Sequence, residues 1–127
     1  MFRSPQVNLY TRDMLRALAF YRDLGFVETF RYPKEGPPEH VELQLDGFVL
    51  GIATEETARA NHGLSPDLAG HSVEIVLWTD DVDTAFDELA ARPADILSRP
   101  HDWLEHLRVA WVSDPDGNPI QIVARRG

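Results

Sequence analysis

The residues best suited to metal or acid–base chemistry in this chain are its five histidines, because the sequence contains no cysteine. Without cysteine, disulfides, thiolate metal sites and cysteine nucleophiles are excluded. His101 and His106 match neither the H-E-x-x-H pattern nor a pair of histidines one helical turn apart. We therefore interpret His101 and His106 as loop residues, and His40 and His62 as exposed residues without a metal role.

Glu74 is the strongest single candidate for chemistry, and His71 precedes it closely in the sequence. Three positions separate them, so on a strand their side chains would point to opposite faces. His71 would stand at the start of that strand and could reach a ligand there. A buried Glu74 would need a partner, and its desolvated carboxylate could serve as a general base in an enzyme.

The first half of the chain predicts a strand, a helix and three further strands. Apolar residues alternate with polar ones in the strands, and they recur at helical spacing after Asp13, a favourable N-cap, up to Gly25. Asp46-Gly47 is a typical two-residue hairpin turn. The predicted strands cover residues 6–11, 27–32, 41–45 and 48–53.

The second half repeats this order after a polar connection, residues 54–70, which has room for one short helical turn. Asp80 or Asp81 would begin the helix, and Pro100, His101 and Trp103 would lie in a loop. Asp114-Pro115-Asp116-Gly117-Asn118 reads as a turn. The predicted strands cover residues 72–78, 95–98, 108–113 and 120–124.

The two halves can be aligned with each other by counting. An offset of 68 residues places Asp13 on Asp81 and Gln6 on Glu74. An offset of 70 residues between the hairpin glycines places Gly51 on Gln121. The chain is therefore predicted to contain two related modules of the same strand and helix order.

Composition restricts the partners of the protein. The 127 residues suit one domain, and 12 Lys and Arg against 21 Asp and Glu give a net charge of −9. This negative charge disfavours nucleic acid and anionic membrane surfaces as binding partners, because both are negatively charged. No apolar run approaches the roughly 20 residues of a spanning helix, and no signal peptide is expected. We expect a soluble, cytoplasmic protein.

The strings FYRDLGF (residues 20–26) and VSDPDGNPIQIV (residues 112–123), together with the repeat, resemble the vicinal oxygen chelate superfamily. That group includes glyoxalase I, extradiol dioxygenases, and fosfomycin- and bleomycin-resistance proteins. The resemblance implies an α+β fold, in which two tandem βαβββ modules form a cup-shaped mixed sheet with helices on its outer face. Residues 1–127 would be a single domain, with module one at about 5–54, a linker at about 55–70 and module two at about 71–125.

The resemblance also implies where a metal would bind. Metal-dependent members hold a divalent ion with four side chains, and those positions correspond here to Gln6, Gly51, Glu74 and Gln121. Glycine offers no side chain, and neutral amides are weak ligands compared with imidazole or carboxylate. We therefore predict no metal ligands and no cofactor.

Strand alternation predicts which side chains face the cup and which pack under the helices. The apolar positions expected under the helices are Val7, Leu9, Phe48, Leu50, Ile52, Val73, Ile75, Leu77, Ile120 and Ile122. The opposite set includes Val76 and Val123. Together with His71 and with Trp103 from its loop, the predicted ligand-binding residues are Gln6, Asn8, Tyr10, Glu42, Gln44, Gly51, His71, Glu74, Trp78, Trp103 and Gln121.

This mixture of aromatic, amide and acidic groups predicts a pocket for a small organic molecule with positive charge, such as an antibiotic. The resemblance then implies a metal-free protein of the bleomycin-resistance type, a homodimer that binds its ligand without turnover. One alternative is a metal-dependent lyase, isomerase or dioxygenase of the glyoxalase type, with Gln6, Glu74 and Gln121 holding the metal. Another is a metal-free enzyme with Glu74 as its catalytic base.

Overall fold

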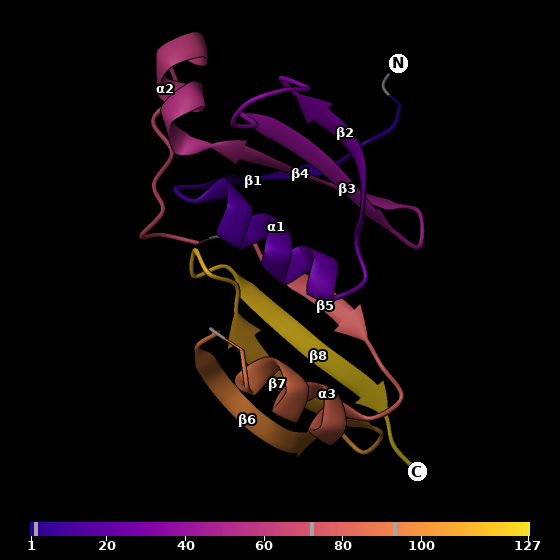
Figure 1. Cartoon of the computed structure of the whole chain (residues 1–127). Coiled ribbons are helices and arrows are strands. Elements are labelled where there is room, and N and C mark those ends of the chain that lie inside the picture. The colour runs from indigo at the N-terminus through magenta and orange to yellow at the C-terminus, as the bar shows by residue number, and fades with distance from the viewer. Residues whose placement is uncertain (2, 72, 93) are drawn as a thin grey trace. The chain divides into compact units, whose positions relative to one another are not determined.

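The computed structural model describes residues 1, 3–71, 73–92 and 94–127, which form two compact units, Met1–Leu68 and Ala69–Gly127 (Figure 1). The first unit contains β1 (Val7–Thr11), α1 (Met14–Asp23), β2 (Val27–Tyr32), β3 (His40–Leu45), β4 (Phe48–Thr54) and α2 (Glu55–His62). The second contains β5 (Ile75–Trp78), α3 (Val82–Ala90), β6 (Ile96–Trp103), β7 (Leu107–Ser113) and β8 (Pro119–Arg125).

The sheet of the first unit has the strand order β1-β4-β3-β2, with β1 parallel to β4 and the other neighbours antiparallel. Alternate residues of its strands, including Leu43, Leu50 and Ile52, are fully buried. The ion pair between Arg22 of α1 and Glu28 of β2 places α1 on the same face of the sheet as these residues. The opposite face is left for polar side chains.

The second unit repeats this arrangement, with the strand order β5-β8-β7-β6 and α3 across one face of the sheet (Figure 1). Asn8 pairs with Gly51 in the first sheet, and Val76 pairs with Gln121 in the second. These pairs are related by the predicted offsets of 68 and 70 residues. The predicted α+β class and its two modules are confirmed.

Both main helices begin as predicted. The Asp13 carboxylate accepts a hydrogen bond from Arg16 N, and the Asp81 carboxylate accepts one from Thr84 N. These side chains satisfy backbone donors that have no partner within the first turn of a helix. Gly25, with a φ of +108°, follows the last turn of α1 in a conformation that favours glycine.

Three segments differ from the prediction. The connection contains α2, a helix of 8 residues whose sequence gives little apolar periodicity, since Ala58 is its one buried apolar residue. β6 continues to Trp103 through the expected loop, and its pairing with β7 is irregular between Ser98 and His101, the stretch that contains Pro100. β5 begins at Ile75, so Val73 is exposed and does not pack under the helix; Ser72 lies outside the described residues.

In the part of the chain that the structure describes, no helix has the length and apolar character needed to cross a membrane.

Arg108 of β7 holds α3 and β6 together. Its guanidinium donates to Asp83 of α3 at 2.7 and 2.9 Å and to Asp102 of β6 at 2.9 Å. The hydrogen bonds from Arg108 lower the pKa of Asp83 below its ordinary value. A carboxyl whose pKa is lower in the folded than in the unfolded chain stabilises the fold above its ordinary pKa, and this contribution is lost as pH falls through the folded pKa.

We therefore expect the urea midpoint of unfolding to fall on acidification from about pH 5 to pH 3, where such carboxyls become protonated. An Arg108→Gln variant should be less stable near neutral pH and should lose less of its remaining stability over that range. Urea titrations at several pH values measure both effects. Parallel curves for the two proteins would contradict this role of Arg108.

Candidate functional site

The face of the first sheet opposite α1 carries two rows of side chains that each cross all four strands. Strand register places Phe30, Glu42, Gly51 and Asn8 in one row. It places Tyr32, His40, Ala53 and Tyr10 in the next row. We call these eight residues the polar face, because Glu42, His40 and Asn8 carry its hydrogen-bonding groups.

A hydrogen-bond network joins this face to Gln6, which precedes β1. Gln6 Nε2 donates to Asn8 Oδ1 at 2.8 Å and lies 3.3 Å from Glu42 Oε2. His40 Nε2 also lies 3.3 Å from Glu42 Oε2. Four of the predicted site residues, Gln6, Asn8, Glu42 and Gly51, thus lie together in the first unit. Tyr10 is in the adjacent row, and Gln44 is exposed on the same face of β3.

Gly51 leaves space that a neighbouring amide fills. A Cβ at position 51 would overlap Asn8 Oδ1 and would lie 3.3 Å from Gln6 Nε2. The Asn8 amide therefore lies over the glycine backbone, where a longer residue would project its own side chain. This arrangement requires the absence of a side chain at position 51.

Three members of the polar face were not expected from the sequence. His40 was interpreted as exposed, but its side chain is 27% exposed and contacts Glu42. Its ring centroid lies 6.1 Å from that of Phe30, which is half exposed, as is Tyr32. A register shift between Glu28 and Phe30 brings Phe30 to this face, and alternation counted from Val27 misses the shift.

The second sheet carries all three tryptophans of the chain on its face opposite α3. Trp111 pairs with Gln121, and Gln121 pairs with Val76. Trp78 pairs with Val123, two residues after Gln121 and hence on the same face. Trp103 pairs with Leu107, which is on the face of Val109 and Trp111. We call this surface the tryptophan face.

Polar groups adjoin each part of the tryptophan face. Trp111 Nε1 donates to Glu74 Oε1 at 3.4 Å, and the His101 ring stacks on Trp111 with centroids 6.3 Å apart. The guanidinium of Arg125 lies 5.2 Å from the centroid of the Trp78 ring, within cation–π distance. Trp78 is 58% exposed and Trp103 is 51% exposed, so both offer apolar surface to a ligand.

Several site predictions need correction in the second unit. Glu74 is exposed rather than buried, and its contact is the Trp111 indole rather than a charged partner. His101 and Trp103 are in β6 rather than in a loop. His71 packs against the turn, with its Nε2 atom 3.1 Å from where a Cβ of Gly117 would be.

Trp111, His101 and Arg125 were not among the predicted site residues. Alternation does not assign Trp111 to a face, because its neighbours Val109, Ala110 and Val112 are all apolar and buried. Its pairing with Gln121 would have revealed its face, but register between distant strands is not readable from one sequence.

The four positions implied for a metal do not offer a strong set of ligands. Gly51 has no side chain and is covered by Asn8, while the Gln6 amide points its nitrogen at Asn8 and Glu42. Glu74 is the one carboxylate of the four, and Gln121 adds a neutral amide. Within the described ranges, no three His, Asp or Glu side chains cluster as metal ligands do. The donor set does not fit a tightly held catalytic ion.

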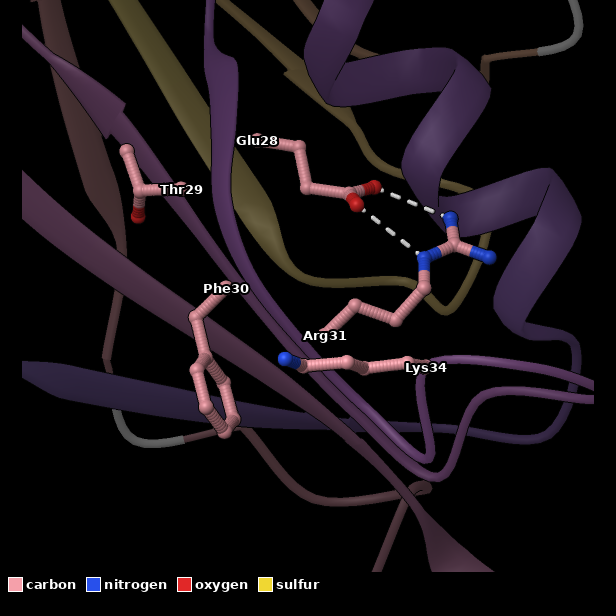
Figure 2. A pocket seen from close by; sticks show the side chains of 5 residues that line it. All are labelled: Glu28, Thr29, Phe30, Arg31 and Lys34. Carbon is pink, nitrogen blue, oxygen red and sulfur yellow. Dashed lines mark hydrogen bonds and ion pairs between the residues drawn. The ribbon is translucent and has the colours of Figure 1, made fainter.

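A surface pocket of about 510 Å³ adjoins β2 of the first unit (Figure 2). Its lining residues are Glu28, Thr29, Phe30, Arg31 and Lys34. Arg31 turns to Glu28 and donates to it at 2.9 and 3.0 Å, as Figure 2 shows. Phe30 thus belongs both to this pocket and to the polar face.

A sequence model of the Glyoxalase/Bleomycin resistance protein/Dioxygenase superfamily matches residues 3–122. The chain belongs to this superfamily. The resemblance predicted from two short sequence strings and the repeat is confirmed, because the superfamily model matches nearly the whole chain. Among proteins with curated functions, none matches this sequence.

Several solved structures share the fold of this chain. Hypothetical protein SA1046 from S. aureus has a TM-score of 0.81 at 20% identity, over 98% of this chain and 95% of its own. TioX from Micromonospora sp. ML1 has a TM-score of 0.73 at 26% identity, over 98% of this chain and 100% of its own. Lactoylglutathione lyase from Agrobacterium tumefaciens has a TM-score of 0.68 at 22% identity, over 95% of this chain and 92% of its own.

Proposed function

We propose that this superfamily member is a metal-free small-molecule-binding protein of the bleomycin-resistance type. The observation that carries the proposal is the tryptophan face, which holds Trp78, Trp103 and Trp111 on one surface of the second sheet. Indole rings are large, rigid and apolar, and they stack on flat aromatic ligands and on organic cations. A soluble domain gains little stability from leaving such rings exposed, so their exposure suits a binding surface.

The chemistry around the face favours a planar aromatic ligand with positive charge. Glu74 supplies a carboxylate beside Trp111, and the chain has a net charge of −9. Arg125 lies over one face of the Trp78 ring and His101 over one face of the Trp111 ring, which leaves the other face of each ring, and Trp103, for stacking. The ligand-binding roles of Gln6, Asn8, Tyr10, Glu42, Gln44 and Gly51 are part of this proposal and concern the first unit.

The competing function is a metal-dependent lyase, isomerase or dioxygenase of the glyoxalase type. It has less support, because the Asn8 amide lies over Gly51 where that type of site would need a ligand. Metal analysis of the purified protein and thermal unfolding with added Ni²⁺, Fe²⁺ or Zn²⁺ distinguish the two functions. Stoichiometric metal, or a large stabilisation that is lost in Glu74→Ala, would refute the metal-free proposal.

The binding proposal predicts that proflavine, a planar aromatic cation, quenches tryptophan fluorescence and raises the midpoint of thermal unfolding. Trp111→Phe should raise the dissociation constant of proflavine about tenfold, because the smaller ring stacks less well and cannot donate to Glu74. Phe48→Leu is the control, since Phe48 is an exposed aromatic residue of the first unit. Equal affinity in wild type and Trp111→Phe would show that the tryptophan face is not the binding surface.

The proposal includes assembly as a homodimer, as the bleomycin-resistance type implies. Sedimentation equilibrium measures the mass directly, and a mass equal to one 14.4 kDa chain at all concentrations would contradict it.

A further inference from the structure

Glu42 contrasts with Glu28 and Glu55, two other glutamates of the first unit that are at least partly buried. Glu28 is 26% exposed and is paired with Arg22 at 2.6 Å and Arg31 at 2.9 Å. Glu55 is 10% exposed and is paired with both Arg12 and Arg59. Each of these carboxylates is compensated by two guanidinium groups, as partly desolvated charges generally are.

Glu42 is 29% exposed, but no arginine or lysine of the described residues pairs with it. Its two side-chain contacts, with Gln6 Nε2 and His40 Nε2, are both 3.3 Å long. Hydrogen bonds to a carboxylate are normally 2.7 to 2.9 Å long when they are strong. The carboxylate therefore has capacity for a cation that the chain itself does not supply.

The surroundings of Glu42 match an organic cation better than a metal ion. Phe30 of β2 pairs directly with Glu42 of β3, so an aromatic ring lies beside the carboxylate, and Tyr32 is in the next row. Gln6 presents an amide nitrogen to Glu42, a donor that cannot bind a metal. Phe30 also lines the pocket beside β2, and this pocket gives room for the apolar part of a ligand.

We propose that the polar face binds an arylamidinium or arylguanidinium group, with its planar N–H fork on the Glu42 carboxylate and its ring against Phe30. A planar fork of N–H donors matches a carboxylate with two parallel hydrogen bonds, and the delocalised charge is attracted to the aromatic face. Lys34, which lines the adjoining pocket, disfavours a second positive charge on the ring. This inference deepens the proposed function by assigning the cationic group of a ligand to the first unit.

Benzamidine and its neutral analogue benzamide test the inference at about pH 8. The side-chain NH₂ signals of Gln6 and Asn8 in ¹H–¹⁵N spectra report binding at the face itself. Benzamidine should shift both signals and benzamide should not. Glu42→Gln should weaken benzamidine at least tenfold, whereas Glu56→Gln, which removes an exposed charge on α2, should change it less than about twofold.

Four results would overturn the inference: no benzamidine shifts up to about 10 mM, equal shifts with benzamide, full affinity in Glu42→Gln, or shifts caused by Zn²⁺ in place of benzamidine. Backbone signals in the same spectra show whether Glu42→Gln is folded. Proflavine quenching of the tryptophans, measured in parallel, separates this inference from the proposed function. Quenching that persists without benzamidine shifts refutes the inference alone.

Discussion

Replacing Asp114 with alanine is expected to lower the free energy of unfolding by about 3 kcal/mol. Asp114 is buried, and its carboxylate accepts hydrogen bonds from Asp116 N at 2.9 Å, Asn118 N at 2.8 Å and Asn118 Nδ2 at 2.7 Å. Alanine would leave these donors without their acceptor at a turn where Asn118 is also buried. Urea unfolding followed by circular dichroism measures the loss.

Two conservative variants make this prediction specific. Asp114→Asn keeps one acceptor oxygen for the backbone donors, and a rotation of the Asn118 amide can restore the third bond, so its cost should be about 1 kcal/mol. Asp46→Asn makes the same change in the exposed hairpin of the first unit, where the φ of +50° suits Asn as well as Asp, and should cost less than about 0.5 kcal/mol. Equal costs for Asp114→Ala and Asp46→Asn would show that the carboxylate does not hold the turn.

The string that contains Asp114 illustrates what a sequence motif can predict. Its Asp, Pro and Gly residues specify a turn, and the alternating residues after it specify a strand with Ile120 and Ile122 in the core. These constraints are local or periodic, so one sequence was enough to predict the order of strands and helices along the chain and both modules. The motif residues themselves build structure, which explains why they identify the fold but not the ligand.

The candidate site was predicted less completely, because it depends on pairing between distant strands. Asn8, Glu42 and Gly51 follow from alternation alone, and the structure places them in one row. Phe30 reaches that row through an irregularity in β2, and Trp111 is the partner of Gln121 across β7 and β8. Such contacts are set by register and by bulges, which composition and periodicity do not determine.

The repeat also shows how two similar modules acquire different surfaces. Gly51 of the first sheet and Gln121 of the second occupy equivalent positions, and so do their partners Glu42 and Trp111. The buried residues at alternate positions remain apolar in both sheets, since they pack under a helix. The open faces are free of that constraint, so one carries a carboxylate with amides and the other carries indoles.

The other motif, FYRDLGF, is predicted to act through Tyr21, whose replacement by alanine should cost about 4 kcal/mol. Tyr21 is 1% exposed on the inner face of α1. Its ring makes edge contacts with Phe20 and Phe26 at centroid distances of 5.2 and 5.6 Å. Alanine would remove both aromatic contacts and leave a cavity that the helix and strands can fill only in part.

Leu15→Ala is the matched control on the same helix, because Leu15 is 70% exposed and alanine is at least as good a helix former. Its free energy of unfolding should change by less than about 0.5 kcal/mol. If Tyr21→Ala were as mild as Leu15→Ala, the aromatic cluster would not be the reason for this motif. The expected contrast follows from burial alone, since both residues belong to one helix and both changes shorten a large side chain to a methyl group.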